Sequence, residues 1–190
     1  MKIPIEISAR HIHLCRKDID ILFGKNYQLQ ILKEISQTGQ FATQETLTLI
    51  NKENKIENVR IIGPERNESQ VEISITDCYK LKVTPIIRIS GDIKGTPGIT
   101  IQGPKGKVQL KQGVIVSKRH LHISEEQNKK FNFKNNQTIS IKVKGERGLI
   151  FDNVVVRLGQ GNNLSFQIDT DEANSAGIIG KGEGEIFRLD

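Results

Sequence analysis

Residues 10–14 read Arg-His-Ile-His-Leu, and residues 119–123 read Arg-His-Leu-His-Ile. The chain has four histidines, and all of them lie in these two segments. The offset between the copies is constant at 109 positions, since 120 − 11 and 122 − 13 agree. The residues before each arginine also match, with Ile-Ser-Ala at 7–9 and Val-Ser-Lys at 116–118. This pattern predicts an internal duplication with two similar halves, each with a corner where a strand meets a helix.

The spacing of each histidine pair indicates a metal site. In a strand, residues i and i+2 point to the same face, about 6–7 Å apart along the backbone. Two imidazoles so placed converge on one ion, and imidazole is a common ligand of zinc. Two ligands are too few, so each site also needs a carboxylate, a thiolate, another histidine or water. The alternative is a pair of half-buried strand histidines that bond to the backbone.

The arginine beside each pair, Arg10 or Arg119, adds a planar cation suited to phosphate or carboxylate. The alternative for both is a salt bridge across a barrel. Together, the histidines and arginines indicate a metal site with an anionic substrate, and they leave the reaction class open.

The rest of the chain is typical of a mainly β protein. Short alternating stretches separated by Gly, Pro and Asn predict many strands, as in barrels and sandwiches. Ser124 to Gln127 fits a capping box that opens a short helix. Its counterpart, Cys15 to Asp18, opens a helix that we expect to end at Gly24. A third short helix is expected at 171–177, and strands are expected at 4–8, 46–50, 59–62, 70–75, 98–101, 107–110, 114–117, 138–143, 154–158 and 164–168.

Composition narrows the function only slightly. The net charge of +6 over 190 residues favours an anionic ligand, or merely reflects solubilising surface lysines. No Trp and only two Tyr argue against a base-stacking, nucleic-acid-binding surface. No apolar run approaches the ~20 residues of a membrane helix. Cys15 and Cys78 form no CxxC motif, so neither a disulfide framework nor a zinc ribbon is predicted.

Ordered segments along nearly the whole chain resemble one enzyme family, the PduL-type phosphate acyltransferases, also called phosphotransacylases or phosphate propanoyltransferases. These enzymes exchange coenzyme A for inorganic phosphate on a short acyl group. The segments are residues 5–14, 36–42, 70–74, 90–92, 98–100, 119–122, 145–153 and 168–174.

The resemblance implies two pseudo-symmetric β-barrels capped by short α-helices. One domain, the central barrel, would span 10–117, and the other would join 1–9 to 118–190. Family members are typically dimers, so a homodimer is expected. The strand-like start of the chain carries neither a signal peptide nor the amphipathic extension of microcompartment-targeted members. A cytoplasmic location is therefore expected, with encapsulation not excluded.

The resemblance also implies residue roles. His11, His13 and Glu72 would hold a first zinc, with a position open for the coenzyme A sulfur; on its own, Glu72 reads as a solvated strand carboxylate. Arg66 would grip phosphate, and Ser90 would lie beside it; unaided, these are a surface charge and a turn residue. His120 and His122 would hold a second zinc with a third histidine.

This sequence departs from that pattern at two positions. Gln167 stands where the third histidine of the second zinc is expected, and an amide oxygen is a weaker, harder ligand than imidazole. The second metal should therefore bind less tightly, or be replaced by water or another ion. Cys15 stands where a capping serine is expected, and cysteine caps poorly. It is either a zinc ligand, an oxidisable thiol or simply a small residue.

The expected reaction is direct attack of phosphate on the acyl-coenzyme A thioester. Zinc would stabilise the thiolate, Arg66 would orient phosphate, and zinc, Arg66 or Ser90 would stabilise the oxyanion. The substrates would be acetyl- or propanoyl-coenzyme A with phosphate, or acyl phosphate with coenzyme A. Two rivals stay open: a metal-dependent acyl-coenzyme A thioesterase, and a non-catalytic binding protein of the same fold.

Overall fold

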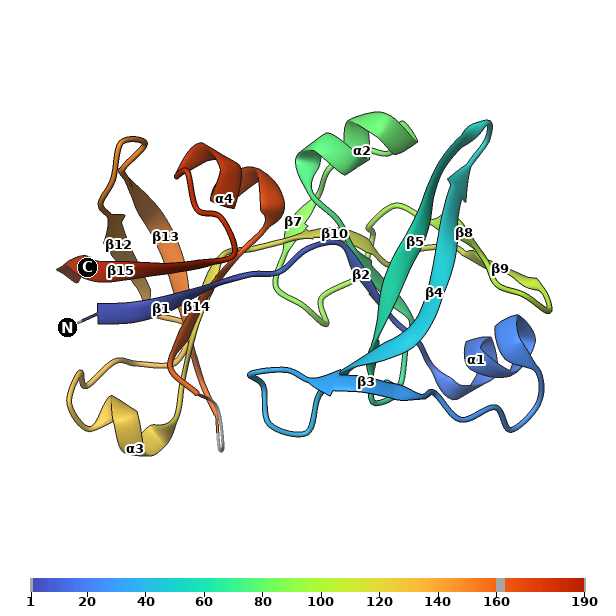
Figure 1. Cartoon of the computed structure of the whole chain (residues 1–190), viewed down its shortest axis with the longest axis horizontal. Coiled ribbons are helices and arrows are strands. Elements are labelled where there is room, and N and C mark those ends of the chain that lie inside the picture. The colour runs from blue at the N-terminus through green and yellow to red at the C-terminus, as the bar shows by residue number, and fades with distance from the viewer. Residues whose placement is uncertain (1, 160–162, 190) are drawn as a thin grey trace. The chain divides into compact units, whose positions relative to one another are not determined.

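A computed structural model describes residues 2–159 and 163–189. Short strands dominate it and four short helices accompany them in the described part, which confirms the mainly β prediction (Figure 1). Contacts between residues divide the chain into two compact units. Unit 1 comprises 1–9, 36–38 and 118–190, and unit 2 comprises 10–35 and 39–117. Each unit has its own hydrophobic core. That each unit is a separate domain stays a prediction.

Unit 1 is a closed barrel with the strand order β1-β14-β11-β13-β12-β15. The first and last strands close it, because β1 pairs antiparallel with β15 (Figure 1). Two short helices, α3 (Glu125–Asn128) and α4 (Thr170–Ser175), connect its strands. The strands are β1 (Lys2–Ile7), β11 (His120–Ile123), β12 (Thr138–Val143), β13 (Leu149–Leu158), β14 (Ser165–Ile168) and β15 (Lys181–Leu189).

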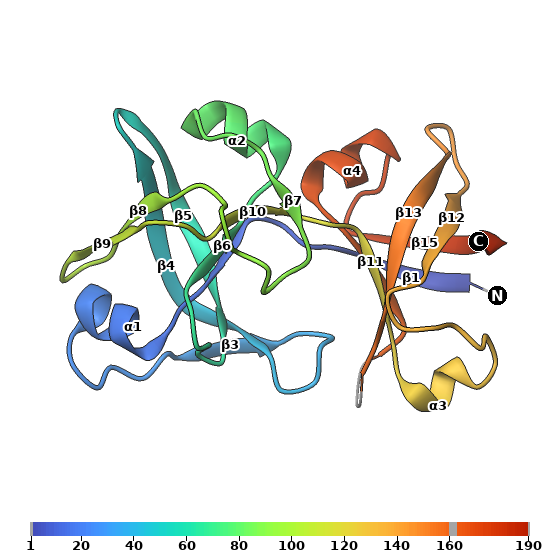
Figure 2. The same cartoon turned by 180° about the vertical axis from the view of Figure 1, so that it is seen from behind.

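Unit 2 is a nine-stranded sheet that curls into a half-barrel, with the order β7-β10-β6-β2-β5-β4-β8-β9 and β3 paired to β4 (Figure 2). Its helices are α1 (Arg16–Phe23) and α2 (Ile75–Leu81). Its strands are β2 (His11–His13), β3 (Ile31–Glu34), β4 (Phe41–Asn51), β5 (Asn54–Gly63), β6 (Gln70–Glu72), β7 (Ile87–Arg88), β8 (Ile99–Gln102), β9 (Lys107–Leu110) and β10 (Val114–Ser117).

The two histidine strands have equivalent neighbours. β2 runs parallel to β5 and antiparallel to β6, and β11 runs parallel to β13 and antiparallel to β14. β10 lies parallel to β6 in unit 2, as β1 lies parallel to β14 in unit 1. The strand that precedes each histidine strand therefore belongs to the opposite unit, because the chain changes unit between residues 9 and 10 and between 117 and 118.

Helix ends follow the sequence signals, with one correction. The capping box of Ser124 and Gln127 is formed, and α1 ends at Gly24 as expected. The strand predicted over 70–75 is wrong beyond Glu72, because a second capping box, between Ser74 and Asp77, starts α2. Mutual side-chain and backbone hydrogen bonds at a helix start outweigh the β propensity of the isoleucines here.

No helix of the described residues is long and apolar enough to cross a membrane.

Candidate active site

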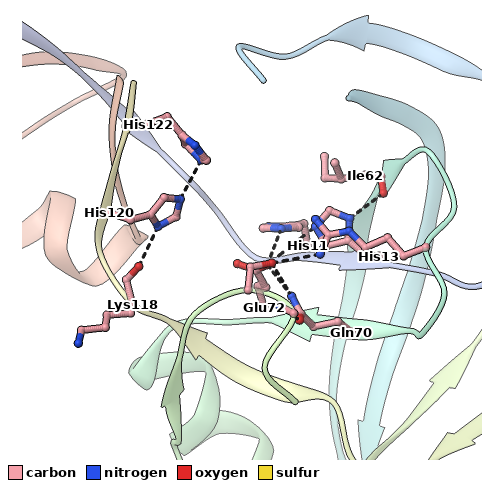
Figure 3. A network of polar contacts seen from close by, with 11 residues as sticks. His11, His13, Ile62, Gln70, Glu72, Lys118, His120 and His122 are labelled. Atoms are coloured by element: carbon pink, nitrogen blue, oxygen red, sulfur yellow. Dashed lines mark hydrogen bonds and ion pairs between the residues drawn. The ribbon is translucent and has the colours of Figure 1, made fainter. Parts of the chain in front are cut away.

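The first histidine pair projects from β2 toward a carboxylate on the neighbouring strand. Ile12 is fully buried in the core of unit 2, which turns His11 and His13 to the other face. Antiparallel pairing sets Glu72 directly opposite His11. Glu72 Oε1 lies 3.6 Å from His11 Nε2 and 3.8 Å from His13 Nε2 (Figure 3). One ligand atom from each residue lies within 4.8 Å of the others.

The His13 ring is held in the orientation that a metal ligand needs. Its Nδ1 lies 3.0 Å from the backbone oxygen of Ile62, which leaves Nε2 facing Glu72 (Figure 3). A carbonyl partner of this kind fixes the tautomer of a ligating histidine. Burial, the charge of His11 and the charge of Arg66 lower the pKa of His13 to about 3. The ring is therefore neutral, as metal binding requires.

Glu72 is a buried carboxylate kept in its charged form. Burial raises its pKa, but its interactions with His11 and His13 and the hydrogen bond from Ser90 outweigh burial. The net pKa lies well below the usual range. Two imidazoles and one ionised carboxylate, held in register by two strands, form a set that fits zinc with a fourth position left over.

Gln70 connects this ligand set to the turn at Ser90 and Gly91. Its Nε2 donates to Glu72 Oε1 at 2.7 Å and to Ser90 Oγ at 3.0 Å, and its Oε1 accepts from the Gly91 amide at 2.7 Å. Gly91 has a φ of +98°, which favours glycine. Because Gln70 is buried and lies opposite His13, it holds both Glu72 and the turn in place.

Arg66 approaches the same cluster through Ser90. Its Nη1 donates to Ser90 Oγ at 3.1 Å, and Ser90 Oγ donates to Glu72 Oε1 at 2.7 Å. A hydroxyl has one donor and two acceptor positions. With Gln70 as the second donor to it, Ser90 gives its proton to Glu72 and accepts from Arg66 and Gln70. The structure thus links Arg66, Ser90 and Glu72, three of the residues predicted from sequence, through one hydroxyl.

Each arginine of the repeat forms an ion pair with an acidic side chain in the first turn of a helix. Arg10 Nε donates to Asp77 at 2.8 Å, and Asp77 belongs to the capping box of α2. Arg119 Nε lies 2.7 Å from Glu172, which belongs to the capping box of α4. Both arginines therefore make the same ion pair in their own units. Their predicted contact with substrate stays a prediction.

The second histidine pair has a different set of neighbours. His120 Nδ1 lies 2.8 Å from the Lys118 oxygen, and the Nε2 atoms of His120 and His122 lie 3.0 Å apart (Figure 3). Gln167 lies opposite His120, and its Nε2 donates to Glu6 at 3.2 Å. Glu6 also accepts from Ser36. Among the described residues, three or more possible metal ligands (His, Cys, Asp or Glu) come together only at the first corner.

Two polar atoms at this second corner are buried without a hydrogen-bond partner, His122 Nδ1 and Ser165 Oγ. Their residues lie directly opposite each other in the β11–β14 pair. Burial, His120 and Arg157 lower the pKa of His122 to about 3, so this ring is neutral as well. Within the described residues, the corner has two imidazoles but no carboxylate or third histidine grouped with them. It fits a metal less well than the first corner does.

Sequence reasoning missed three polar residues near the first corner: Gln70, Asp18 and Ser69. Gln70 could have been found, because it lies two residues before Glu72 and must share its face if the segment is a strand. Asp18 and Ser69 are 51 positions apart and carry no spacing signal.

Comparison with known proteins gives a consistent result. Residues 4–179 match the phosphate propanoyltransferase family. The phosphate propanoyltransferase of Thermotoga maritima is 46% identical over 175 residues, which is 92% of this chain and 83% of that protein. That of Leptotrichia buccalis is 44% identical over 182 residues, 96% of this chain and 86% of that protein. That of Enterococcus faecalis is 44% identical over 184 residues, 97% and 87% respectively.

Proposed function

We propose, from the premise that the chain belongs to the phosphate propanoyltransferase family, that it catalyses zinc-dependent acyl transfer between coenzyme A and inorganic phosphate. The family makes it a phosphate acyltransferase. The proposal adds the metal, its ligands and the residues that handle phosphate. One observation carries it: His11, His13 and Glu72 group around one point, and a hydrogen-bond chain connects that point to Arg66.

The residues of the first corner suit the acyl transfer in two ways. His11, His13 and Glu72 would hold zinc, which stabilises a thiolate at neutral pH. The Arg66 guanidinium offers N–H donors in a planar fork that matches phosphate oxygens. Holding phosphate beside the thioester lowers the entropic barrier to attack.

The acyl group is transferred by addition of phosphate followed by loss of the thiolate. A phosphate oxygen forms a bond to the thioester carbonyl carbon, and the carbon–sulfur bond breaks. The electron pair leaves with sulfur as the coenzyme A thiolate. In the tetrahedral intermediate, Arg66 supplies positive charge near the oxyanion. Ser90 donates its proton to Glu72, so we assign it to holding Glu72 and Arg66. The reverse reaction uses the same contacts, and no acyl-enzyme forms.

Phosphate dependence separates this reaction from thioester hydrolysis. Purified enzyme should release thiol from propanoyl- or acetyl-coenzyme A only when phosphate is present, and acyl phosphate should appear in equal amount. Thiol release at the same rate without phosphate would establish a thioesterase instead.

Metal content separates catalysis from passive binding. We expect about one tightly bound zinc per chain, lost together with turnover in His11→Ala. The matched control is His120→Ala, which should keep that zinc. Unchanged metal and turnover in His11→Ala would rule out the first corner as the active site.

The family resemblance is also the basis for the proposed oligomeric state and cellular location. We propose a homodimer in the cytoplasm, and light scattering of the purified protein measures the mass that tests the dimer.

A further inference from the structure

At the start of α1, a serine from a neighbouring loop bridges the two groups that an ordinary capping box joins directly. Cys15 is the N-cap of α1 and makes no side-chain capping bond. Its backbone amide donates to Ser69 Oγ at 3.0 Å, and Ser69 Oγ donates to Asp18 Oδ2 at 2.5 Å. Asp18 is the third residue of the helix. In an ordinary capping box that side chain would reach the N-cap amide directly. Here Ser69 lies between the two groups.

The other three helices lack this arrangement. Ser74, Ser124 and Asp169 each cap their own helix and form complete capping boxes. Within the described part of the chain, only α1 has its N-cap amide bound by a side chain from outside the helix. The corresponding position at the second corner is Ser124, 109 residues after Cys15, and it caps directly.

The loop that supplies Ser69 also carries Arg66. Ser69 and Asp18 are both buried, so the link between them is shielded from solvent. At Arg66, the backbone amide donates to the Leu14 oxygen at 2.8 Å, and Arg66 forms a β-bridge with Cys15. The segment 64–69 is therefore attached to the end of β2 and the start of α1 at two points, one on each side of Glu68.

We propose that Asp18 and Ser69 are positioning residues that hold the Arg66 loop against the first histidine corner. Their connection to catalysis rests on the proposed function, in which Arg66 binds phosphate. Loss of the Ser69 hydroxyl removes both the bridge from Asp18 to the Cys15 amide at the start of α1 and one attachment of the loop. Small displacements of a binding group lower kcat/KM, by about 100-fold for a misplacement of 1 Å. The loop attachment therefore matters beyond the stability of the helix.

Cys15 makes the two consequences separable. Cys15→Ser gives α1 an N-cap of its own and leaves the loop attachment untouched. We expect Ser69→Ala to lower the midpoint of thermal unfolding and to raise KM for phosphate about tenfold, with kcat changed less than threefold. In Cys15→Ser with Ser69→Ala, the midpoint should return to the wild-type value, while KM for phosphate stays raised. Recovery of KM in the double variant would show that the link is only structural.

Hydrogen exchange tests the positioning without any assay of activity. The Arg66 amide should exchange at least tenfold faster in the double variant than in Cys15→Ser alone. Equal protection of Arg66 in these two proteins would overturn the proposal, even if the enzyme uses phosphate as expected. Faster exchange in an enzyme whose turnover needs no phosphate would support the positioning and refute only the proposed function.

Asp18 supplies a further comparison. Asp18→Asn keeps an oxygen that accepts from Ser69 and should retain KM for phosphate within about twofold. Asp18→Ala should raise it as Ser69→Ala does. Asp20→Ala, on the same helix but bonded to Arg16 and the Asn26 amide, is the matched control and should leave KM unchanged. The same KM in Asp18→Ala and wild type would exclude Asp18 from the role.

Discussion

Glu72 and Gln167 occupy equivalent positions in the repeated fold. Each lies directly opposite the first histidine of its pair on an antiparallel neighbour, Glu72 opposite His11 and Gln167 opposite His120. Glu72 faces its histidines as an ionised carboxylate, whereas the Gln167 amide donates to Glu6. A neutral amide contributes far less to metal binding than a carboxylate or an imidazole. The duplicated framework therefore carries two corners of different chemistry.

Gln167→His should convert the second corner into a metal site. A third imidazole opposite His120 completes a three-histidine set, which is a known zinc arrangement. Elemental analysis after dialysis should rise from about one zinc per chain to about two. Gln102→His, at a half-buried position on β8, is the control and should stay at one. A wild-type content of two would contradict the asymmetry.

Gln70→Glu should weaken the first site. The substitution keeps an oxygen for the Gly91 amide but replaces the donor to Glu72 with a second carboxyl. Loss of a partner that orients a ligand typically costs about 10–100-fold in metal affinity or activity. Competition with a chelator measures the zinc affinity, and Gln102→Glu is the matched control. Wild-type affinity in Gln70→Glu would mean that the hydrogen bond to Glu72 has no role.

Arg10→Met should destabilise the protein. Asp77 is buried, and removal of the guanidinium leaves its carboxylate without that ion pair. We expect a loss of about 1–3 kcal/mol in the free energy of unfolding, measured with urea. Arg88→Met, which breaks an exposed pair with Asp92, should cost about 0–1 kcal/mol. A large rise in KM for phosphate at unchanged stability would instead place Arg10 at the substrate.

Acid should destabilise the fold through His122. Its pKa is about 3 in the folded protein and about 6.5 in the unfolded chain, so between these values only the unfolded state binds the proton. Stability is therefore full above pH 6.5 and falls as the pH decreases toward 3. With a chelator present, His122→Gln should reduce the stability difference between pH 7 and pH 5 by about 1–2 kcal/mol.

The control for the acid effect is Lys130→Gln, an exposed substitution that should leave the slope unchanged. An identical pH dependence in His122→Gln and wild type would show that His122 titrates normally in the folded protein.

Much of the fold could be predicted from the sequence, because strands and helix starts have local sequence signals. Alternation of apolar residues placed most strands, and Ser124 with Gln127 marked a helix start. The strand predicted over 70–75 was too long. The alternation of Val71, Ile73 and Ile75 continues beyond the end of β6, where Ser74 caps α2. Closure of the first barrel depends on β1 pairing with β15, and a contact between the two ends of the chain has no local signal.

Part of the candidate site could also be predicted, because some of its residues have local sequence signals. The spacing of the histidines identifies them as candidate metal ligands, and the family resemblance adds Glu72, Arg66 and Ser90 to the candidate site. The structure groups His11, His13 and Glu72, and their role as zinc ligands stays a prediction. Ser69 and Asp18 were not predictable, because their link depends on how a loop folds over a helix start.

The passage of the chain between the units sets an order of synthesis. Every strand of the unit 2 sheet has been synthesised once residue 117 is added, but the barrel then still lacks β11 to β15. Throughout that interval β1 lacks its partner strands, because β14 and β15 lie more than 150 residues further along the sequence. Pairing over such separations is slow. We therefore expect the first histidine corner to form before the barrel closes.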